Sequence, residues 1–237
     1  ASLGYLDENG TISTTSFRRI TARLGAEFTP YDWFEFGLNA NYSNSRSDYL
    51  GASGTQANNI WYTAMMMAPI YPVYELDSDG NAILENGKRV FDYGSSRPAG
   101  AQNNRNCIAT LFDDDYNMTS DNVNLRGHLG IKFGDFKLST SLGADILNEN
   151  NTTKYNRNNG NAAGSGRLTK EYQRTRSYTW NQLLSYKHVF GEHTVDVMAG
   201  HEFYNIESHY LMGQRTGFPF DDFTELGMGS TLADATS

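Results

Sequence analysis

The amino-acid sequence predicts an all-β fold of antiparallel, up-and-down strands, of the kind that crosses a membrane as a β-barrel. Three observations support this prediction. Apolar and polar residues alternate along several runs with the period of two that strands impose. Short turns alternate with long polar connections along the chain. Large aromatic side chains gather beside each short turn.

Three tight hairpins carry the alternation. The first joins residues 17–28 to 33–43 through a turn at Thr29 to Asp32, the second turns at Gly134-Asp135, and the third at Gly191-Glu192. A shorter hairpin precedes them, because Asn9-Gly10 is a strong turn signal. We expect one domain with strands near 2–6, 11–29, 32–45, 121–133, 136–148, 172–190 and 193–210, and with long loops at 46–120, 149–171 and 211–237.

The connections indicate a membrane barrel. Loops longer than about 12–15 residues are unusual inside a compact domain, and the three long ones must all lie at one end of the sheet. Outer-membrane barrels have short periplasmic turns, long extracellular loops and girdles of aromatic residues at both interfaces. The apolar strand face would then meet lipid. The polar face would line the lumen, with Arg23, Glu27, Asn39, Arg126, His128 and Lys132 among its residues.

Composition excludes several other classes of protein. Hydrophobic residues make up 38% of the chain and the mean hydropathy is −0.58. No run approaches the roughly 18 apolar residues of a transmembrane helix. A net charge of −8 argues against nucleic acid as a partner. The first ten residues show no signal peptide. The single Cys107 allows no intramolecular disulfide.

No motif in the sequence predicts catalysis. The nucleophile-elbow, Walker and His-Glu-x-x-His patterns do not occur, so we expect no enzyme activity and no cofactor. The Asp77-Ser-Asp-Gly-Asn run fails as a calcium loop, because its sixth and twelfth positions are Ala82 and Lys88. It predicts an Asx-type turn instead. Asp113-Asp114-Asp115 is a charge run or a weak calcium site, and no metal is assigned.

The long loop at 46–120 has the composition of a sugar-binding surface. Aromatic rings stack on the apolar faces of sugars, and polar side chains pair with the hydroxyl groups. The same rings also serve to pack a loop against its neighbours, and that interpretation stays open. The candidate substrate-binding residues are Trp61, Tyr62, Tyr71, Tyr74, Arg97 and Arg105.

Three segments resemble SusC/RagA-type TonB-dependent transporters of Bacteroidetes outer membranes. SFRRITARLGAEFTPYDWFEFGLNANYSNS is similar to a strand pair of that barrel, and MMMAPIYPVYELDSDGNAI to a loop element. HTVDVMAGHEFYNIESHYLMGQRTGFPFDDFTEL is similar to the family's later strand-and-loop pattern. The three occur in the family's order and span most of the chain.

The resemblance implies a large barrel of 22 strands around a plug, located in the bacterial outer membrane. It also implies import of oligosaccharides or peptides, driven through TonB and assisted by a SusD-like surface lipoprotein that caps the mouth. No TonB box, plug domain or closing strand is visible. We therefore expect an internal segment of the barrel, in contact with outer-membrane lipid. Seven strands alone would leave edges that lipid does not tolerate.

Two alternatives remain. A soluble or surface-exposed β-sandwich that binds glycans would show the same period of two, but would need neither an aromatic girdle nor long loops at one end only. A small complete barrel of about eight strands would need a closing carboxyl-terminal strand, and the final LGMGSTLADATS shows no alternation.

Overall fold

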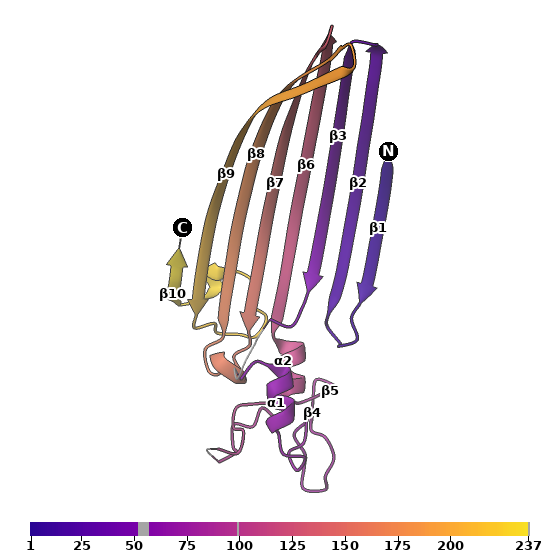
Figure 1. Cartoon of the computed structure of the whole chain (residues 1–237). Helices are drawn as coiled ribbons and strands as arrows, with labels where there is room; N and C mark the ends of the chain where they lie inside the picture. The colour runs from indigo at the N-terminus through magenta and orange to yellow at the C-terminus, as the bar shows by residue number, and fades with distance from the viewer. Residues whose placement is uncertain (52–56, 99, 237) are drawn as a thin grey trace.

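Eight antiparallel strands form one open sheet, in the order β1-β2-β3-β6-β7-β8-β9-β10 (Figure 1). The computed structural model describes residues 1–51, 57–98 and 100–236. Every neighbour in the sheet is also the next long strand along the chain, so the topology is up-and-down. The strands are β1 (Ser2–Asn9), β2 (Ser16–Tyr31), β3 (Phe34–Asp48), β6 (Asp115–Phe133), β7 (Phe136–Tyr155), β8 (Arg167–Phe190), β9 (His193–Thr216) and β10 (Thr231–Thr236).

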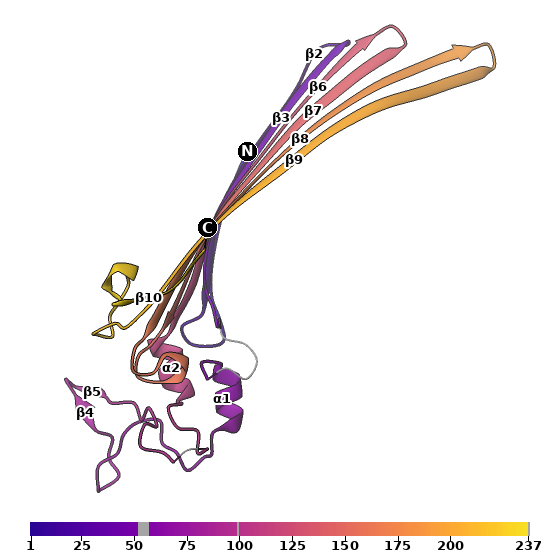
Figure 2. The ribbon, with the colours of Figure 1, turned by 90° about the vertical axis from the view of Figure 1, so that its left-hand side faces the viewer.

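The two ends of the sheet differ, as the connection lengths predict. The tight turns between β2 and β3, β6 and β7, and β8 and β9 lie together at one end (Figures 1 and 2). The opposite end carries the long connections, which we call the loop end. These contain α1 (Ile60–Met66), α2 (Cys107–Asp113), the two-residue strands β4 (Leu84–Glu85) and β5 (Lys88–Arg89), and the 3₁₀ turns η1 (Gly160–Ala162) and η2 (Leu226–Met228).

Aromatic rings stack at the turn end. Phe28 and Phe36 face each other across the first hairpin with ring centroids 6.5 Å apart, and Phe133 and Phe136 do so across the second at 5.5 Å. Phe136 continues the contact to Tyr186 on β8 at 4.8 Å. Gly134 and Gly191 have φ of 62°, the positive value that the first position of a type II′ turn requires.

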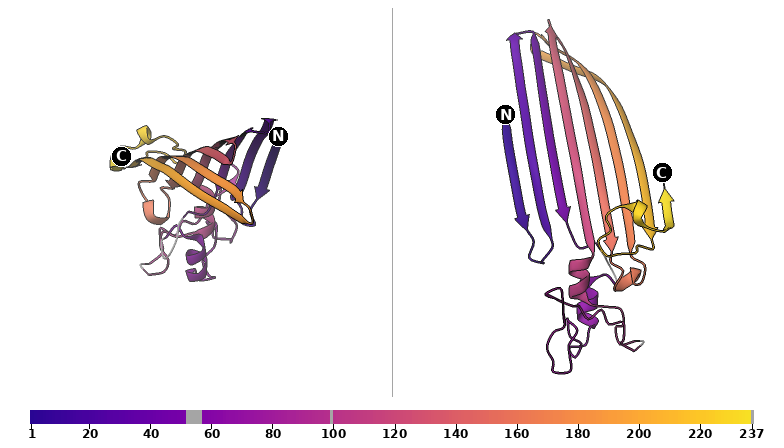
Figure 3. Two further views of the ribbon diagram at one scale, coloured as in Figure 1. Left: turned by 45° about the horizontal axis from the view of Figure 1, so that its top comes forward. Right: turned by 180° about the vertical axis from the view of Figure 1, so that it is seen from behind.

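The sheet is a single twisted layer that does not close (Figure 3). The other sheet in the described part of the chain is the small β4-β5 pair at the loop end. Large apolar side chains therefore remain uncovered, with Leu142 61% exposed and Leu38 48%. A buried apolar cluster of Leu168, Phe218 and Phe223 lies at the loop end, away from the middle of the sheet. A β-sandwich would bury one face of each strand beneath a second large sheet. The described part of the chain contains no such second sheet, which argues against the sandwich alternative.

The register assigns every strand residue to one of two faces, because paired residues on adjacent strands point the same way. Leu24, Ala40, Leu125, Ala144 and Tyr178 form one continuous row on the apolar face. Gln182 and His201 are polar exceptions on that face and lie 3.1 Å apart as hydrogen-bond partners. On β6 the apolar face extends from Val123 to Phe133, about 33 Å of strand, or roughly 25 Å when tilted like a barrel strand.

The strands extend further toward the loop end than the sequence predicts. β6 begins at Asp115 rather than near 121, and β9 ends at Thr216 rather than near 210; β7 and β8 lengthen to match. These extensions carry polar residues on both faces, so the period of two vanishes there although the backbone ladder continues. β3 likewise ends at Asp48 rather than near 45.

Three further expectations about the strands are wrong. The sheet has eight strands rather than seven, since β10 pairs its backbone with the edge of β9 despite its irregular sequence. Asn9-Gly10 does not make a two-residue turn, because Asn9 pairs with Ser16 and leaves a loop at 10–15. The first long hairpin turns at Asp32-Trp33, with Tyr31 paired to Phe34.

The turn after Asp77 is confirmed as an Asx turn. Its Oδ1 accepts from the backbone N–H of Asp79 at 2.9 Å and from that of Asn81 at 2.8 Å.

Within the described ranges, no helix has the length and apolar character needed to cross a membrane.

Candidate functional site

The connection between β3 and β6 folds into two short helices, each started by an asparagine. The Asn59 side chain accepts hydrogen bonds from the backbone N–H groups of Trp61 and Tyr62 and begins α1. Asn106 does the same for Ile108 and Ala109 and begins α2. Such caps satisfy backbone donors that a helix leaves unpaired at its start. The two asparagines thus determine where the helices of this loop begin.

Asp114, directly after α2, joins three segments of the loop end. Its Oδ1 accepts from the backbone N–H and the side-chain amide of Asn156, at 2.8 and 2.6 Å. Its Oδ2 accepts from Asn58 at 2.5 Å and from the Tyr116 hydroxyl at 3.3 Å. Asn58 in turn accepts from the backbone N–H of Asn161 at 2.7 Å. One carboxylate therefore ties the start of α1, the start of β6 and the loop between β7 and β8.

Burial dominates the ionisation of this network. It raises the pKa of Asp114 above the ordinary value, against the four hydrogen bonds, which favour the charged form. Burial also raises the pKa of Asp113, whose carboxylate accepts from the Tyr93 hydroxyl at 3.0 Å. The same cause raises the pKa of Tyr93 and Tyr116, so both phenols stay neutral donors.

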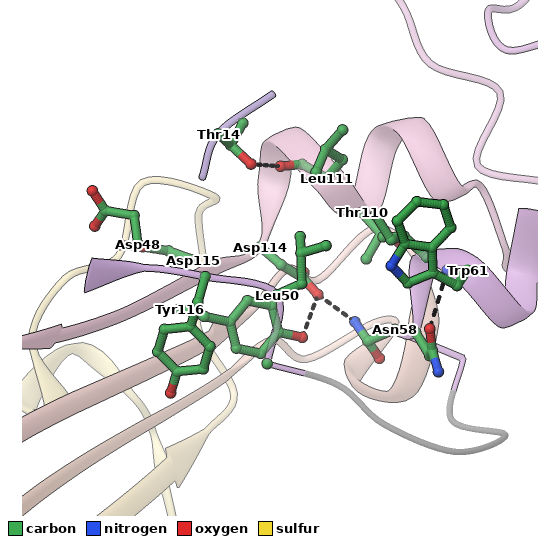
Figure 4. A pocket seen from close by; sticks show the side chains of 14 residues that line it. Thr14, Asp48, Leu50, Asn58, Trp61, Thr110, Leu111, Asp114, Asp115 and Tyr116 are labelled. Carbon is green, nitrogen blue, oxygen red and sulfur yellow. Dashed lines mark hydrogen bonds between the residues drawn. The ribbon is translucent and has the colours of Figure 1, made fainter. Parts of the chain in front are cut away.

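Asp114 and Tyr116 form part of the wall of a cavity of about 350 Å³ (Figure 4). The cavity lies between the loop-end tips of β3 and β6 and the helices α1 and α2. Trp61 borders it and is 57% exposed, so its ring is available to a ligand. Leu50 and Leu111 add apolar surface, while Thr14 reaches across from the loop between β1 and β2 and donates to the Leu111 carbonyl at 3.1 Å.

Gly51 sets the fit of this wall. A Cβ at that position would overlap the Tyr116 ring, so the backbone approaches the ring as only glycine allows. The wall combines aromatic and apolar side chains with Asp, Asn and Thr side chains, a mixture that offers both stacking and hydrogen-bonding contacts to a small molecule.

The structure distributes the predicted substrate-binding residues over the long loop. Trp61 lines the cavity; Arg97 lies over the Tyr71 ring at 4.3 Å, and Arg105 over the Tyr62 ring at 5.6 Å. Tyr74 stacks on Phe91 with centroids 5.2 Å apart. The Arg97 side chain is 5% exposed and forms an ion pair with Asp92. These contacts pack Tyr71, Tyr74 and Arg97 against other residues of the loop, and the role of all six residues in substrate binding stays a prediction.

The sequence did not point to three residues of the cavity wall. Tyr49 and Tyr116 lie at strand ends that the sequence predicts to be loop, and Thr14 lies in a connection where the sequence predicts the strand at 11–29. Asp114 stood out only as part of an acidic run. The run itself divides: Asp113 and Asp114 face hydrogen-bond donors of the loop, whereas Asp115 is exposed. Among the described residues, no group of His, Cys, Asp and Glu is arranged to hold a metal ion.

The six residues predicted to face a lumen share one face of the sheet. Glu27 lies beside Gly37, which pairs with His128; Asn39 pairs with Arg126. Arg23 pairs with Asn41 two residues further along the same face, and Lys132 pairs with Lys137 at the turn end. This polar face lies opposite the apolar row through Leu125.

The geometry defines a class of protein: a segment of a β-barrel wall with one apolar face, one polar face and a structured loop end. No family model matches the chain. It is 25% identical to the TonB-dependent receptor SusC of Bacteroides thetaiotaomicron, over 255 aligned residues that cover all of this chain and 24% of SusC.

Solved structures share the fold. A structure of the RagAB peptide transporter matches 99% of this chain and 26% of its own, with a TM-score of 0.73 and 20% sequence identity. A structure of the RagAB peptide importer in its open-open state matches 99% of this chain and 25% of its own, with a TM-score of 0.73 and 21% identity. The chain thus spans about a quarter of the length of its relatives. The chain is similar to a segment of SusC/RagA-type TonB-dependent receptors, in line with the resemblance of its sequence motifs. These relatives are a receptor and a transporter rather than enzymes.

Proposed function

We propose that this chain forms part of the wall of a TonB-dependent nutrient importer in the bacterial outer membrane. The observation that carries the proposal is the apolar face of the sheet, which no other described element covers and whose extent on β6 matches the thickness of a membrane. In water-soluble proteins, a second layer of secondary structure covers the apolar face of a sheet. Lipid would cover it here.

The opposite face would line the lumen. Arg23, Glu27, Asn39, Arg126 and His128 present charged and amide groups there, and Lys132 adds a cation near the turn end. Such groups hydrate a channel interior or pair with a plug domain. The Glu35 carboxylate and the Lys137 ammonium lie 2.7 Å apart on this face, so part of the lumen charge is neutralised within the wall.

The loop end would be extracellular, as long connections are in outer-membrane barrels. A SusD-like lipoprotein would cover it, and TonB would act through segments outside this chain. The imported substrate would be an oligosaccharide or a peptide, and the cavity beside Trp61 is the part of this segment best shaped to contact it. RagAB is described as a peptide transporter, which makes a peptide the first substrate class to test.

Site-directed spin labelling of the full-length transporter tests the orientation of the wall. Cysteine would replace Leu125 or Arg126, neighbours on opposite faces of β6, in a background with Cys107→Ser. In outer-membrane vesicles, we expect the label at 125 to collide more often with oxygen, which concentrates in lipid. The label at 126 should collide more often with a water-soluble nickel chelate. Equal, water-like accessibility at both positions would reject a membrane wall.

A further inference from the structure

A groove runs across the apolar face of the sheet. It has a volume of about 480 Å³ and is shared by β3, β6, β7, β8 and β9. Gly127 and Ala144 create the room, because each leaves a gap between large side chains of neighbouring strands. Its larger lining side chains are Leu38, Leu125, Leu142, Tyr178, Trp180 and Phe203.

Two arginines stand on the same face directly beyond the groove. Arg176 and Arg174 follow Tyr178 at alternate positions of β8 in the direction of the loop end. The Nε atom of each is shielded from solvent and has no hydrogen-bond partner. Within the described ranges neither guanidinium has an ion-pair partner, although Glu207 is the cross-strand neighbour of Arg176.

Other arginines of this face are paired. Arg18 lies 3.3 Å from the Asp7 carboxylate and Arg46 lies 3.2 Å from that of Asp48. They lie on β2 and β3, near the loop-end edge of the apolar band, as Arg174 and Arg176 do on β8. Arg215, also on this face, donates to the Gly229 carbonyl. Among the described arginines of this face, Arg174 and Arg176 therefore differ from the others in having neither an ion pair nor a hydrogen bond.

We propose that this surface binds one phosphorylated lipid of the surrounding membrane, with an acyl chain in the groove and the phosphate between Arg174 and Arg176. The inference rests on the proposed function, because this face must meet lipid. A planar guanidinium matches phosphate oxygens with two parallel donors. The two arginines are about 7 Å apart along the strand, close enough for both to reach one phosphate.

The height of the arginines fits a lipid headgroup. The row of Arg176 still contains apolar Val123 and Ile146, whereas the next row, with Arg174, contains Asn148 and His209. The apolar band therefore ends between the two arginines, at the level where headgroups begin. A second copy of this chain is a poorer occupant, because self-association through this face would bring unpaired arginines together.

Native mass spectrometry of the full-length transporter in detergent tests the proposal. The protein would be titrated with phosphatidic acid, with phosphatidylcholine of the same acyl chains, and with inorganic phosphate. We expect preferential binding of phosphatidic acid, and about 30-fold weaker binding in the R174Q/R176Q variant, since each arginine near an anionic lipid contributes roughly fivefold. The matched control is R18Q/R46Q, which should bind like the unchanged protein.

A second variant tests the groove separately. A Cβ at Gly127 would have its nearest neighbours at 3.9 and 4.0 Å, so Gly127→Leu fills the groove without a clash at its base. It should weaken binding of both lipids while the preference for the phosphate remains. Inorganic phosphate binding as tightly as phosphatidic acid would reduce the site to one for free anions.

Two further results would overturn the inference. One is an unchanged preference for phosphatidic acid in R174Q/R176Q; the other is no lipid bound to the unchanged protein. If the spin label at 125 still reports lipid, the barrel wall stands and the specific lipid site alone fails. If that label reports water, the proposed function fails with it.

Discussion

The Asp114 carboxylate accepts two hydrogen bonds from Asn156, one from its backbone N–H at 2.8 Å and one from its side-chain amide at 2.6 Å. The two residues lie 42 positions apart in the sequence and meet at the open end of the β6-β7 hairpin, directly before β6 and directly after β7. Because Asp114 also accepts from Asn58, it connects the long loop that contains α1 to the neighbouring loop. The wall of the cavity depends on this connection.

Replacing Asp114 with asparagine should open the loop end. One acceptor oxygen becomes a donor that faces donors, which leaves buried groups unsatisfied at a cost of about 2–3 kcal/mol. Hydrogen exchange of the full-length protein should show the loss as faster exchange at the Asn156 amide. Asp115→Asn is the matched control, because Asp115 is exposed and accepts only from Asn117. Equal acceleration in both variants would contradict the role of Asp114.

The stability of the same loop should depend on pH. Burial raises the pKa of Asp114 and of Asp113 above the ordinary value of 3.8, to which each returns when the loop opens. At a pH between the ordinary pKa of the open loop and the raised pKa of the closed loop, the closed loop binds more protons than the open one. The free energy of opening therefore falls as pH rises through this range.

The measurement is the opening free energy of the Asn156 amide by hydrogen exchange, from about pH 4 to pH 7 and corrected for the intrinsic rate. We expect a downward slope in the unchanged protein. The slope should disappear in the Asp113→Asn/Asp114→Asn variant, in which neither group titrates. A loop that grows more stable as pH rises would show that hydrogen bonding, rather than burial, controls these carboxyls.

Sequence reasoning succeeded where one physical constraint acts on every residue of a strand. From Val123 to Phe133 successive residues face an apolar and then a polar environment, so the period of two in the sequence reveals both the strand and its register. It failed where that constraint ends. From Asp115 to Asn122 one face of β6 is polar and the other mixes Tyr116 and Met118 with polar residues, and the strand persists because its backbone pairs with β3 and β7. Backbone pairing leaves no trace in the order of side chains.

The loop-end cavity was harder to predict for a related reason. Trp61 could be named from composition, because an indole ring in a polar loop is a good ligand contact. Asp114, Asn58 and Asn156 acquire their role from contacts between distant segments. Nothing in the local sequence distinguishes Asp114 from Asp115, although one is partly buried in a hydrogen-bond network and the other is exposed.

Trp61 should contribute to substrate binding more than its neighbours on α1. Its ring borders the cavity, whereas Met65, one turn later and 78% exposed, does not line it. Trp61→Ala should weaken binding of the transported substrate about tenfold or more, as loss of a central aromatic contact does. Met65→Ala should leave binding unchanged. Calorimetry of the full-length transporter with peptide and oligosaccharide panels provides the measurement, and equal effects of both changes would remove the cavity from the binding path.

A single charge should distinguish the two faces of β3. Leu38 lies near the middle of the apolar band, and its neighbour Asn39 lies on the polar face. An arginine on the lipid face of a barrel costs about 2–4 kcal/mol at the bilayer midplane and little elsewhere. We therefore expect Leu38→Arg to lower the amount of correctly assembled full-length protein in the outer membrane, measured by heat-modifiable migration on gels. Asn39→Arg should assemble normally, because its side chain would enter a hydrated lumen. If Asn39→Arg were the more damaging change, the assignment of the two faces would have to be reversed.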